Sequence, residues 1–168
     1  MSYANRGKGL EQMIEYSNNV YRQKGVATVQ KIPTPVKVLN VNRNGKLTGF
    51  YEKKSTVDYI GVWQGTGICF DAKETKIETR FDLSNVKDHQ YGYMKDWHES
   101  GGLSFLIVSF VTLDEIYYLP FEKLRYWKEE ADRKSIPYDE FEWAIHKTSV
   151  PVDYSELLHH HKNYKEVD

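Results

Sequence analysis

The chain has 168 residues, enough to bury a hydrophobic core as one domain, and its formal net charge is −1. No apolar run is long enough to span a membrane and the N-terminus lacks a signal-peptide pattern, so we do not expect a membrane protein. Cys69 is the only cysteine, which excludes disulfides within the chain and fits a reducing, cytoplasmic setting.

Charge is divided unevenly along the chain. Residues 1–56 hold ten Lys and Arg against three Asp and Glu, whereas residues 57–168 hold thirteen against twenty-one. A basic first third predicts a surface that binds a polyanion such as nucleic acid. The alternative is a chance imbalance of solvated charges, because charge clusters are commonly no more than surface.

A helix is predicted at residues 10–21, where apolar residues such as Leu10 and Ile14 recur at helical spacing. Gly25 is well placed to end it. Glu11 lies beside the apolar stripe near the helix N-terminus, where an acid favours the helix dipole. Its alternative role is that of a further acid in a metal site.

After an expected strand at residues 26–32, the chain at about residues 34–54 is predicted to form a hairpin. Extended runs flank Asn44-Gly45, and Asn-Gly is the strongest short hairpin signal. Large apolar residues are few near the tip, so we expect the hairpin to project as a stalk. Its basic residues are Lys37, Arg43 and Lys46. They suit entry into a DNA cavity, or they discourage aggregation at an exposed sheet edge.

Residues 58–73 are predicted to form two adjacent strands separated by a turn at residues 64–67. Asp58 opens the first strand. Side chains in the second strand alternate between its faces, so Asp71 and Lys73 lie on the same face, turned away from the apolar one. This face is expected to meet the start of the neighbouring strand, where Asp58 lies.

Two carboxylates and a lysine on one sheet edge suit metal-assisted hydrolysis of a phosphodiester. Asp58 and Asp71 would bind Mg²⁺, a hard cation that prefers oxygen ligands, and the metal would activate water. Lys73 would stabilise charge on the phosphate or hold the water. An acid two residues before a lysine is weak evidence alone, since it occurs four times here. The alternative is a surface ion pair between Asp71 and Lys73.

Ser84 is a plausible N-cap for a helix at about residues 85–99. The predicted inner stripe of this helix is Val86, His89, Gln90, Tyr93, Met94 and Trp97. Gln90 is thus a polar group on an apolar face, where it must be hydrogen-bonded or must ligate something.

The rest of the chain is predicted to contain a fully buried strand at residues 103–110, a shorter strand at residues 115–119 and a C-terminal helical segment at about residues 120–164. The helices expected there lie at residues 121–131, 137–146 and 152–164, the last starting at Asp153. Three adjacent helical residues cannot all ligate one metal, so His159, His160 and His161 are interpreted as surface residues.

Several blocks in fixed order distinguish the chain further. They are Asn5-Arg6-Gly7 with Leu10-Glu11, residues 31–36, residues 55–59, residues 70–75, Asp88-His89-Gln90 with Met94, and residues 103–110. With these blocks the chain resembles the RecU family of bacterial Holliday junction resolvases, which belongs to the PD-(D/E)xK nuclease superfamily. The resemblance runs from about Tyr3 to Ser155.

The resemblance implies an α/β fold with a restriction-endonuclease-like core, in which helices flank a mixed central β-sheet and a β-hairpin stalk protrudes. It implies a homodimer that makes paired nicks in four-way junction DNA with Mg²⁺, for which Mn²⁺ can substitute. The chain would be one nuclease domain over residues 1–168, in the cytoplasm of a bacterial host cell. Its short N-terminus would suit a phage-encoded member.

The resemblance also assigns roles to residues. Asp58, Asp71 and Gln90 match metal-binding positions, Lys73 matches the catalytic lysine, and Glu11 is a further catalytic candidate. The chain departs from the family pattern where Asp71 replaces the usual glutamate and Val57 replaces a hydroxyl residue. The expected DNA-binding residues are Arg6, Lys8, Lys37, Arg43, Lys46 and Lys76.

Three functions are therefore considered. The first is a structure-selective endonuclease that resolves Holliday junctions in recombination and repair. The second is a non-catalytic protein that binds branched DNA or modulates a recombinase partner. The third is a nuclease of the same fold that acts on other DNA, such as a restriction or repair enzyme.

Overall fold

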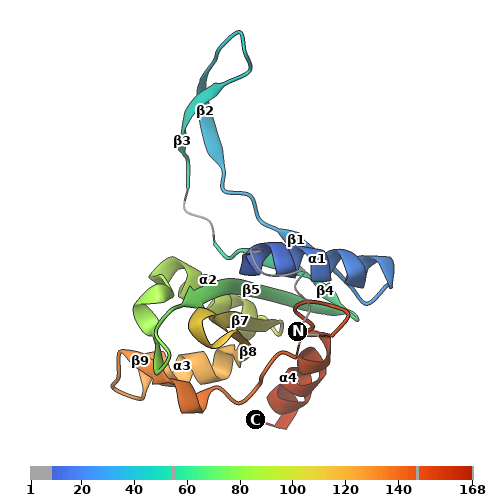
Figure 1. Ribbon diagram of the computed structural model, residues 1–168, viewed down its shortest axis with the longest axis vertical. Helices are drawn as coiled ribbons and strands as arrows, with labels where there is room; N and C mark the ends of the chain where they lie inside the picture. The colour runs from blue at the N-terminus through green and yellow to red at the C-terminus, as the bar shows by residue number, and fades with distance from the viewer. Residues whose placement is uncertain (1–8, 54–55, 147, 168) are drawn as a thin grey trace.

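A five-stranded mixed sheet with strand order β1-β4-β5-β7-β8 forms the centre of the molecule (Figure 1). This computed structural model describes residues 9–53, 56–146 and 148–167. The strands are β1 (Ala27–Lys31), β4 (Tyr59–Trp63), β5 (Thr66–Thr75), β7 (Leu103–Phe110) and β8 (Glu115–Pro120). β5 and β7 run parallel, and the other neighbours are antiparallel. The expected mixed sheet is confirmed.

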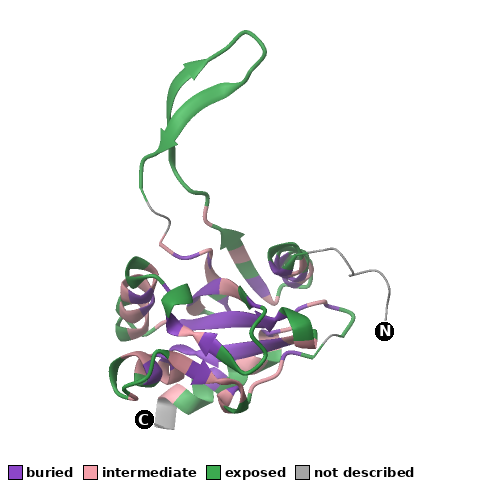
Figure 2. Cartoon of the chain, turned by 60° about the vertical axis from the view of Figure 1, so that its left-hand side comes forward, coloured by how far each residue is buried: buried purple, intermediate pink, exposed green. Residues whose placement is uncertain are grey.

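Helices cover both faces of this sheet. α1 (Leu10–Gln23) and α4 (Ser155–Val167) contribute to one buried cluster, and α2 (Asp88–Glu99) and α3 (Phe121–Glu129) contribute to the other. β5 supplies Ile68 and Phe70 to the first cluster and Cys69 to the second. The predicted alternation along this strand is thus confirmed, and the burial colours of Figure 2 show the sheet as the buried middle layer.

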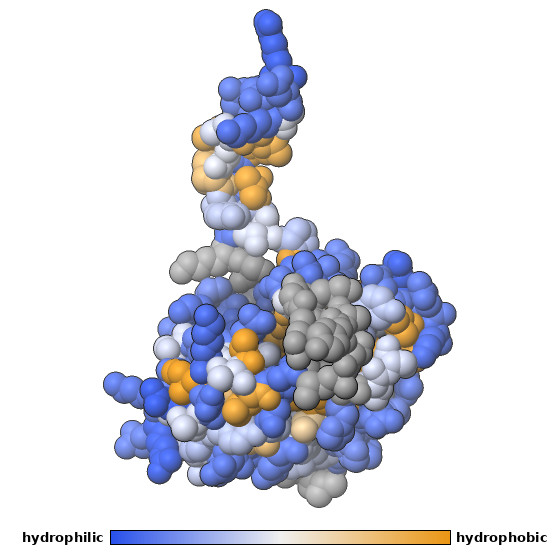
Figure 3. All heavy atoms as spheres, viewed as in Figure 1, coloured by the Kyte–Doolittle hydropathy of each residue, from blue (hydrophilic) through white to orange (hydrophobic). Residues whose placement is uncertain are grey.

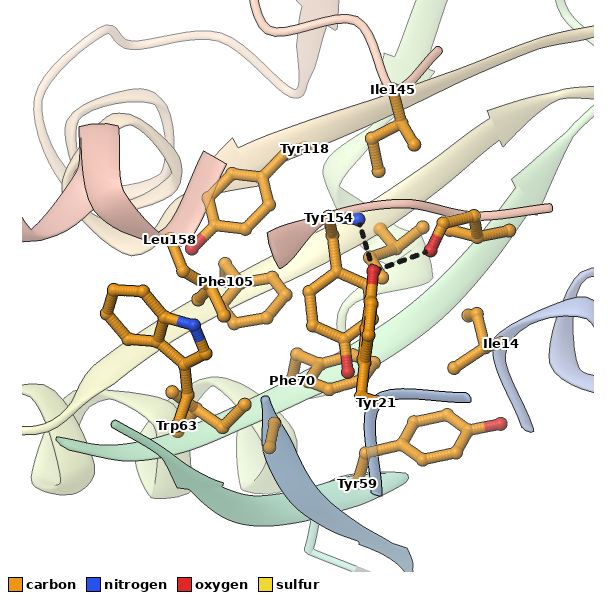
Figure 4. Close-up of a cluster of buried hydrophobic side chains, with 14 of the residues drawn as sticks. Ile14, Tyr21, Tyr59, Trp63, Phe70, Phe105, Tyr118, Ile145, Tyr154 and Leu158 are labelled. Carbon is orange, nitrogen blue, oxygen red and sulfur yellow. Dashed lines mark hydrogen bonds between the residues drawn. The ribbon is translucent and has the colours of Figure 1, made fainter. Parts of the chain in front are cut away.

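Aromatic side chains dominate the cluster beneath α1 and α4 (Figure 4). Tyr59, Phe70 and Phe105 stack in sequence, with ring centroids 4.8 and 4.7 Å apart. The Tyr21 hydroxyl donates to the Asp153 carboxylate at 2.7 Å and accepts the Tyr154 backbone N–H at 2.9 Å. This contact fastens α1 to the segment that leads into α4.

The predicted hairpin projects from the body as β2 (Val36–Val41) and β3 (Leu47–Tyr51), and every residue of both strands is exposed (Figures 1 and 2). Gly45 has φ of +75°, and the Asn42 side chain accepts the backbone N–H groups of Asn44 and Lys46. These bonds replace the backbone partners that the tip lacks. The stalk is therefore confirmed, although apolar side chains gather halfway along it, below a hydrophilic tip (Figure 3).

Helix α2 starts later than predicted. Its N-cap is Lys87, and a short 3₁₀ turn (Leu83–Asn85) occupies the expected first turn, so the prediction of Ser84 as N-cap is wrong. The later start changes which residues face the core. His89 is exposed, whereas Tyr91 and Met94 are buried. Gln90 stays partly buried, as its position on the inner side required.

The described part of the segment between α3 and α4 consists mainly of turns and irregular backbone. β6 (Arg80–Asp82) and β9 (Ser135–Pro137) form a small antiparallel sheet that the sequence did not predict. The expected helix at residues 137–146 is wrong beyond one 3₁₀ turn (Tyr138–Glu140). The following residues instead line the outer edge of β8, where Tyr118 N–H donates to Trp143 C=O and Ile145 N–H donates to Ile116 C=O.

The three histidines of α4 are not equivalent. His159 and His160 are exposed, but His161 is fully buried, so its interpretation as a surface residue is wrong. Its Nδ1 lies 2.7 Å from the Tyr118 hydroxyl and its Nε2 lies 2.8 Å from a Glu122 oxygen. A buried imidazole is stable here because both ring nitrogens have partners.

Within the described residues, no helix is long and apolar enough to cross a bilayer.

Candidate active site

The two predicted acids meet where β4 begins beside β5. The Gln64-Gly65 turn, with φ of +45° and +79°, joins the strands and pairs Tyr59 with Phe70. Positive φ at both central residues is the geometry of tight hairpin turns. The predicted turn at residues 64–67 is therefore shorter than expected. This register sets Asp58, directly before β4, next to Asp71 in the middle of β5.

Hydrogen bonds lock the two carboxylates to the backbone. Asp71 is fully buried, and its Oδ1 accepts the Asp58 backbone N–H at 2.7 Å. Asp58 Oδ2 in turn accepts the Ala72 backbone N–H at 3.0 Å. Asp71 therefore holds the backbone of Asp58, and Asp58 holds the backbone of Ala72, the residue after Asp71. The two carboxylates are thus fixed in place before any ligand binds.

Lys73 and Gln90 complete the group. Lys73 Nζ lies 2.8 Å from Asp71 Oδ2 and donates to Gln90 Oε1 at 3.0 Å. The same Gln90 oxygen accepts the Lys87 backbone N–H at 3.1 Å, at the start of α2. Gln90 thus satisfies a free N–H of the helix end and positions the lysine. The side chain of Lys73 is only 15% exposed, so the pair is not the surface ion pair considered as the alternative.

The environment disfavours charge on Asp58. Burial and the nearby charge of Asp71 raise the pKa of Asp58 to about 6, although the Ala72 N–H and Lys73 oppose the rise. Two carboxylates that share one partly buried space repel each other unless a proton or a cation lies between them. Asp71 Oδ2 also accepts no hydrogen bond of good geometry and faces only the lysine ammonium.

These observations fit a divalent cation. Asp58 and Asp71 supply the hard oxygen donors that Mg²⁺ prefers. Asp71 Oδ2 lies 2.8 Å from Lys73 Nζ and accepts no hydrogen bond, so it keeps lone-pair capacity for a cation. The described residues contain no cluster of three or more His, Cys, Asp or Glu that could hold a metal. The remaining positions would be open to water and phosphate, and to the Gln90 amide oxygen if it gave up its hydrogen bond from Lys73 or Lys87. Mg²⁺ commonly keeps several waters and takes only one or two carboxylates.

Glu11 lies near these acids without joining them. Its carboxylate is 2.6 Å from Lys31 Nζ, and its charge makes the smallest of the contributions that raise the pKa of Asp58, after burial and Asp71. Sequence reasoning missed a different acid, Glu74, whose Oε1 accepts the Leu10 backbone N–H at 3.2 Å. Glu74 caps α1 from the strand that carries Asp71 and Lys73. The only sequence feature that could have indicated this role is the position of Glu74 directly after Lys73.

The predicted DNA-binding residues fall into two places. Lys37, Arg43 and Lys46 are exposed on the stalk, and Lys76 is exposed just past the end of β5 on the body of the molecule. Arg6 and Lys8 lie outside the described residues. The stalk cations and the acid site are linked through the chain, since β1 leads into the hairpin and Asp58 follows its return.

A family model described as RecU, Recombination protein U, matches residues 5–165. This chain belongs to the RecU family. It is 41% identical over 162 residues to the proteins named Holliday junction resolvase RecU from Staphylococcus aureus strains JH9 and COL. Each match covers 92% of this chain and 76% of the relative. The family resemblance inferred from the sequence blocks is confirmed.

Solved structures were also compared with this chain. Hjc from Archaeoglobus fulgidus, a Holliday junction resolvase from an archaeal hyperthermophile, aligns with a TM-score of 0.47 at 7% sequence identity. The alignment covers 86% of this chain and 98% of Hjc. Assignment to the RecU family rests on the sequence matches.

Proposed function

We propose that this RecU-family chain is an endonuclease that resolves Holliday junctions by paired, metal-dependent nicks. The single observation that carries the chemistry is the locked pair of Asp58 and Asp71 with Lys73 at 2.8 Å. Membership of a family whose relatives are named Holliday junction resolvases supports the choice of substrate. Its site of action would be DNA in the cytoplasm of a bacterial cell.

In this proposal Asp58 and Asp71 hold Mg²⁺, or Mn²⁺ in its place, and Gln90 adds its amide oxygen or acts through Lys73. When bound, the metal supplies a Lewis acid that polarises the phosphate and lowers the pKa of a bound water. The Lys73 ammonium lies within reach of any phosphate that meets these carboxylates, where it would stabilise the developing negative charge. Asp71 and Gln90 fix the direction in which the ammonium points.

The stalk would bind the junction itself. A body of modest size could not enclose branched DNA, but a projecting hairpin with Lys37, Arg43 and Lys46 could contact backbones at the branch point. Symmetric cuts on two strands require two copies of the site, so we propose a homodimer as the active form. A recombinase remains a candidate protein partner.

Cleavage of a labelled synthetic four-way junction tests the proposal. The native chain with Mg²⁺ should give paired nicks, and Asp71→Asn and Lys73→Ala should bind the junction without cutting it. Asp96→Asn is a matched control, because Asp96 is an exposed acid on α2. Binding without any cleavage in Mg²⁺ or Mn²⁺ would favour the non-catalytic alternative.

Two further measurements separate the remaining alternatives. Linear duplex in parallel reactions tests for a nuclease that acts on other DNA, since a junction-selective enzyme should leave it intact. Sedimentation of the native chain measures the oligomeric state. A strict monomer at the concentrations that cut junctions would contradict coordinated paired nicks.

A further inference from the structure

A pocket lies on the side of the molecule away from the acid site. It has a volume of about 390 Å³, and its walls come from the end of β8, the start of α3, residues 140–143 and Tyr164 of α4. Strand β8, which lines the pocket, is separated from β5 by β7 in the sheet order, and the pocket shares no lining residue with the acid site. Its volume falls within the range of natural ligand sites.

Aromatic side chains form much of the wall. Trp127 and Trp143 line the pocket, and Tyr126 and Tyr164 lie at its rim, each about half exposed. Trp143 and Tyr164 meet edge to face, with ring centroids 6.1 Å apart. Half-exposed aromatic faces attract cations through the ring quadrupole, and the planar guanidinium of arginine stacks on them well.

Acidic groups dominate the polar part of the lining. The pocket lining holds three carboxylates and one lysine, namely Glu122, Glu140, Glu142 and Lys123. Lys123 Nζ lies 3.4 Å from Glu140 and 3.6 Å from Glu142, so the carboxylates already share one ammonium. The lining therefore has more carboxylates than ammonium groups, and an incoming cation would meet unbalanced negative charge.

Glu122 is an unusual member of this lining. Its side chain is only 10% exposed, and its Oε1 accepts no hydrogen bond, although His98 Nδ1 lies 3.4 Å away. Burial is the largest single effect and would raise its pKa. The hydrogen bond and charge of His161, a backbone hydrogen bond and the charge of His98 together lower the pKa of Glu122 below its usual value. Glu122 thus contributes an ionised carboxylate to the pocket lining, with His98 and His161 beside it.

We infer that this pocket binds an arginine side chain, with an adjoining apolar residue, from a segment of a partner protein. The carboxylates and aromatic faces select the guanidinium, and the volume leaves room for the apolar neighbour beside the two tryptophans. The pocket is then a protein-docking site that operates independently of junction cleavage. Charge complementarity of this kind gives specificity and a faster association rate.

The test uses a capped tripeptide, acetyl-Leu-Arg-Leu-amide, titrated into the full-length, ¹⁵N-labelled protein. The chain has four tryptophans, and their indole N–H signals report separate places. Trp127 and Trp143 line the pocket, whereas Trp63 is buried in the cluster beneath α1 and α4 and Trp97 contacts Gly67. The first two signals should shift with the peptide, and the other two should stay.

The matched peptide carries citrulline, which keeps the shape of arginine without its charge, and should bind about tenfold more weakly. Glu140→Gln with Glu142→Gln should weaken arginine-peptide binding about threefold to tenfold, since both side chains are exposed and screened. Glu130→Gln, an exposed acid outside the pocket, should leave the affinity unchanged. The double variant should cut junctions as the native chain does.

Three results would overturn the inference. Equal affinities for the arginine and citrulline peptides would show that the pocket does not recognise charge. Equal shifts of all four indole signals would show binding elsewhere or a general change of structure. Shifts of the Trp127 and Trp143 signals with protein concentration alone would show that a second copy of this chain occupies the pocket.

Discussion

Asp58→Asn is expected to stabilise the metal-free chain while it abolishes cleavage. Burial and the charge of Asp71 raise the pKa of Asp58 from 3.8 to about 6, so its carboxylate is held ionised at neutral pH at a cost to the folded state. Two pKa units correspond to ~3 kcal/mol. Because Asp58 is only partly buried, solvent screening should reduce the gain to about 1–2 kcal/mol. Asparagine keeps an oxygen for the Ala72 N–H.

For a chain of this length, that gain raises Tm by roughly 2–8 °C. The folded state binds more protons than the unfolded state between pH 3.8 and about 6, so the cost grows as pH rises through this window and is constant above it. Thermal unfolding in EDTA should therefore show the gain of Asp58→Asn in full at about pH 7.5 and in much smaller measure at about pH 4.5.

Mg²⁺ should reverse the order of stability. At a concentration 100 times its Kd, the metal should stabilise the native chain by about 2.7 kcal/mol and the variant far less. Asp96→Asn, an exposed acid on α2, serves as the control and should change Tm little at either pH. A lower Tm for Asp58→Asn in EDTA at neutral pH would refute the reasoning, and so would a gain that is equal at both pH values.

Three other outcomes are expected. Gln90→Ala should lower the rate of junction cleavage by about 10–100-fold with little loss of junction binding, because it removes the amide oxygen that positions Lys73, the proposed catalytic lysine. Equal losses in both assays would contradict a positioning role. Lys46→Ala on the stalk should weaken junction binding and reduce the slope of log affinity against log salt by about 1, whereas Lys162→Ala on α4 should not. His161→Ala should lower the free energy of unfolding in urea by about 2–4 kcal/mol, since it leaves two buried partners unpaired, and the exposed His160→Ala should change it by less than about 0.5 kcal/mol.

The acid site could be predicted because it depends on local rules. Asp58, Asp71 and Lys73 lie on two strands joined by a tight turn, so strand alternation alone places their side chains together. Gln90 was predicted by a weaker argument, that a polar residue on an apolar helix face needs a partner. Its partners, Lys73 Nζ and the Lys87 N–H, depend on how α2 packs beside β5.

The errors lie where tertiary contacts override local signals. Ser84 has the chemistry of an N-cap, but the chain before α2 is held by its backbone bond from Leu83 N–H to Lys134 C=O, so the helix starts later. Residues 137–146 contain helix-forming residues, yet residues 143–145 pair with the open edge of β8. This pairing gives partners to backbone groups of Ile116 and Tyr118 on a strand edge.

His161 shows the same limit for single residues. Three consecutive histidines on a C-terminal helix are predicted to be exposed to solvent, and for His159 and His160 this prediction is correct. The burial of His161 depends on Tyr118 and Glu122, which come from β8 and α3 and are far away in sequence. No local pattern encodes such a pair of partners.

The stalk is anchored at the acid site. The backbone N–H of Ile32, where the chain leaves β1 for the hairpin, donates to the C=O of Asp58, where the chain returns, at 2.8 Å. Both ends of the insertion therefore meet at a residue whose side chain is a proposed metal ligand. A load on the hairpin, such as a DNA arm pushing against it, would reach the Asp58 carboxylate through one hydrogen bond and a short run of main chain, so the stalk would be mechanically coupled to the site as well as attached to it.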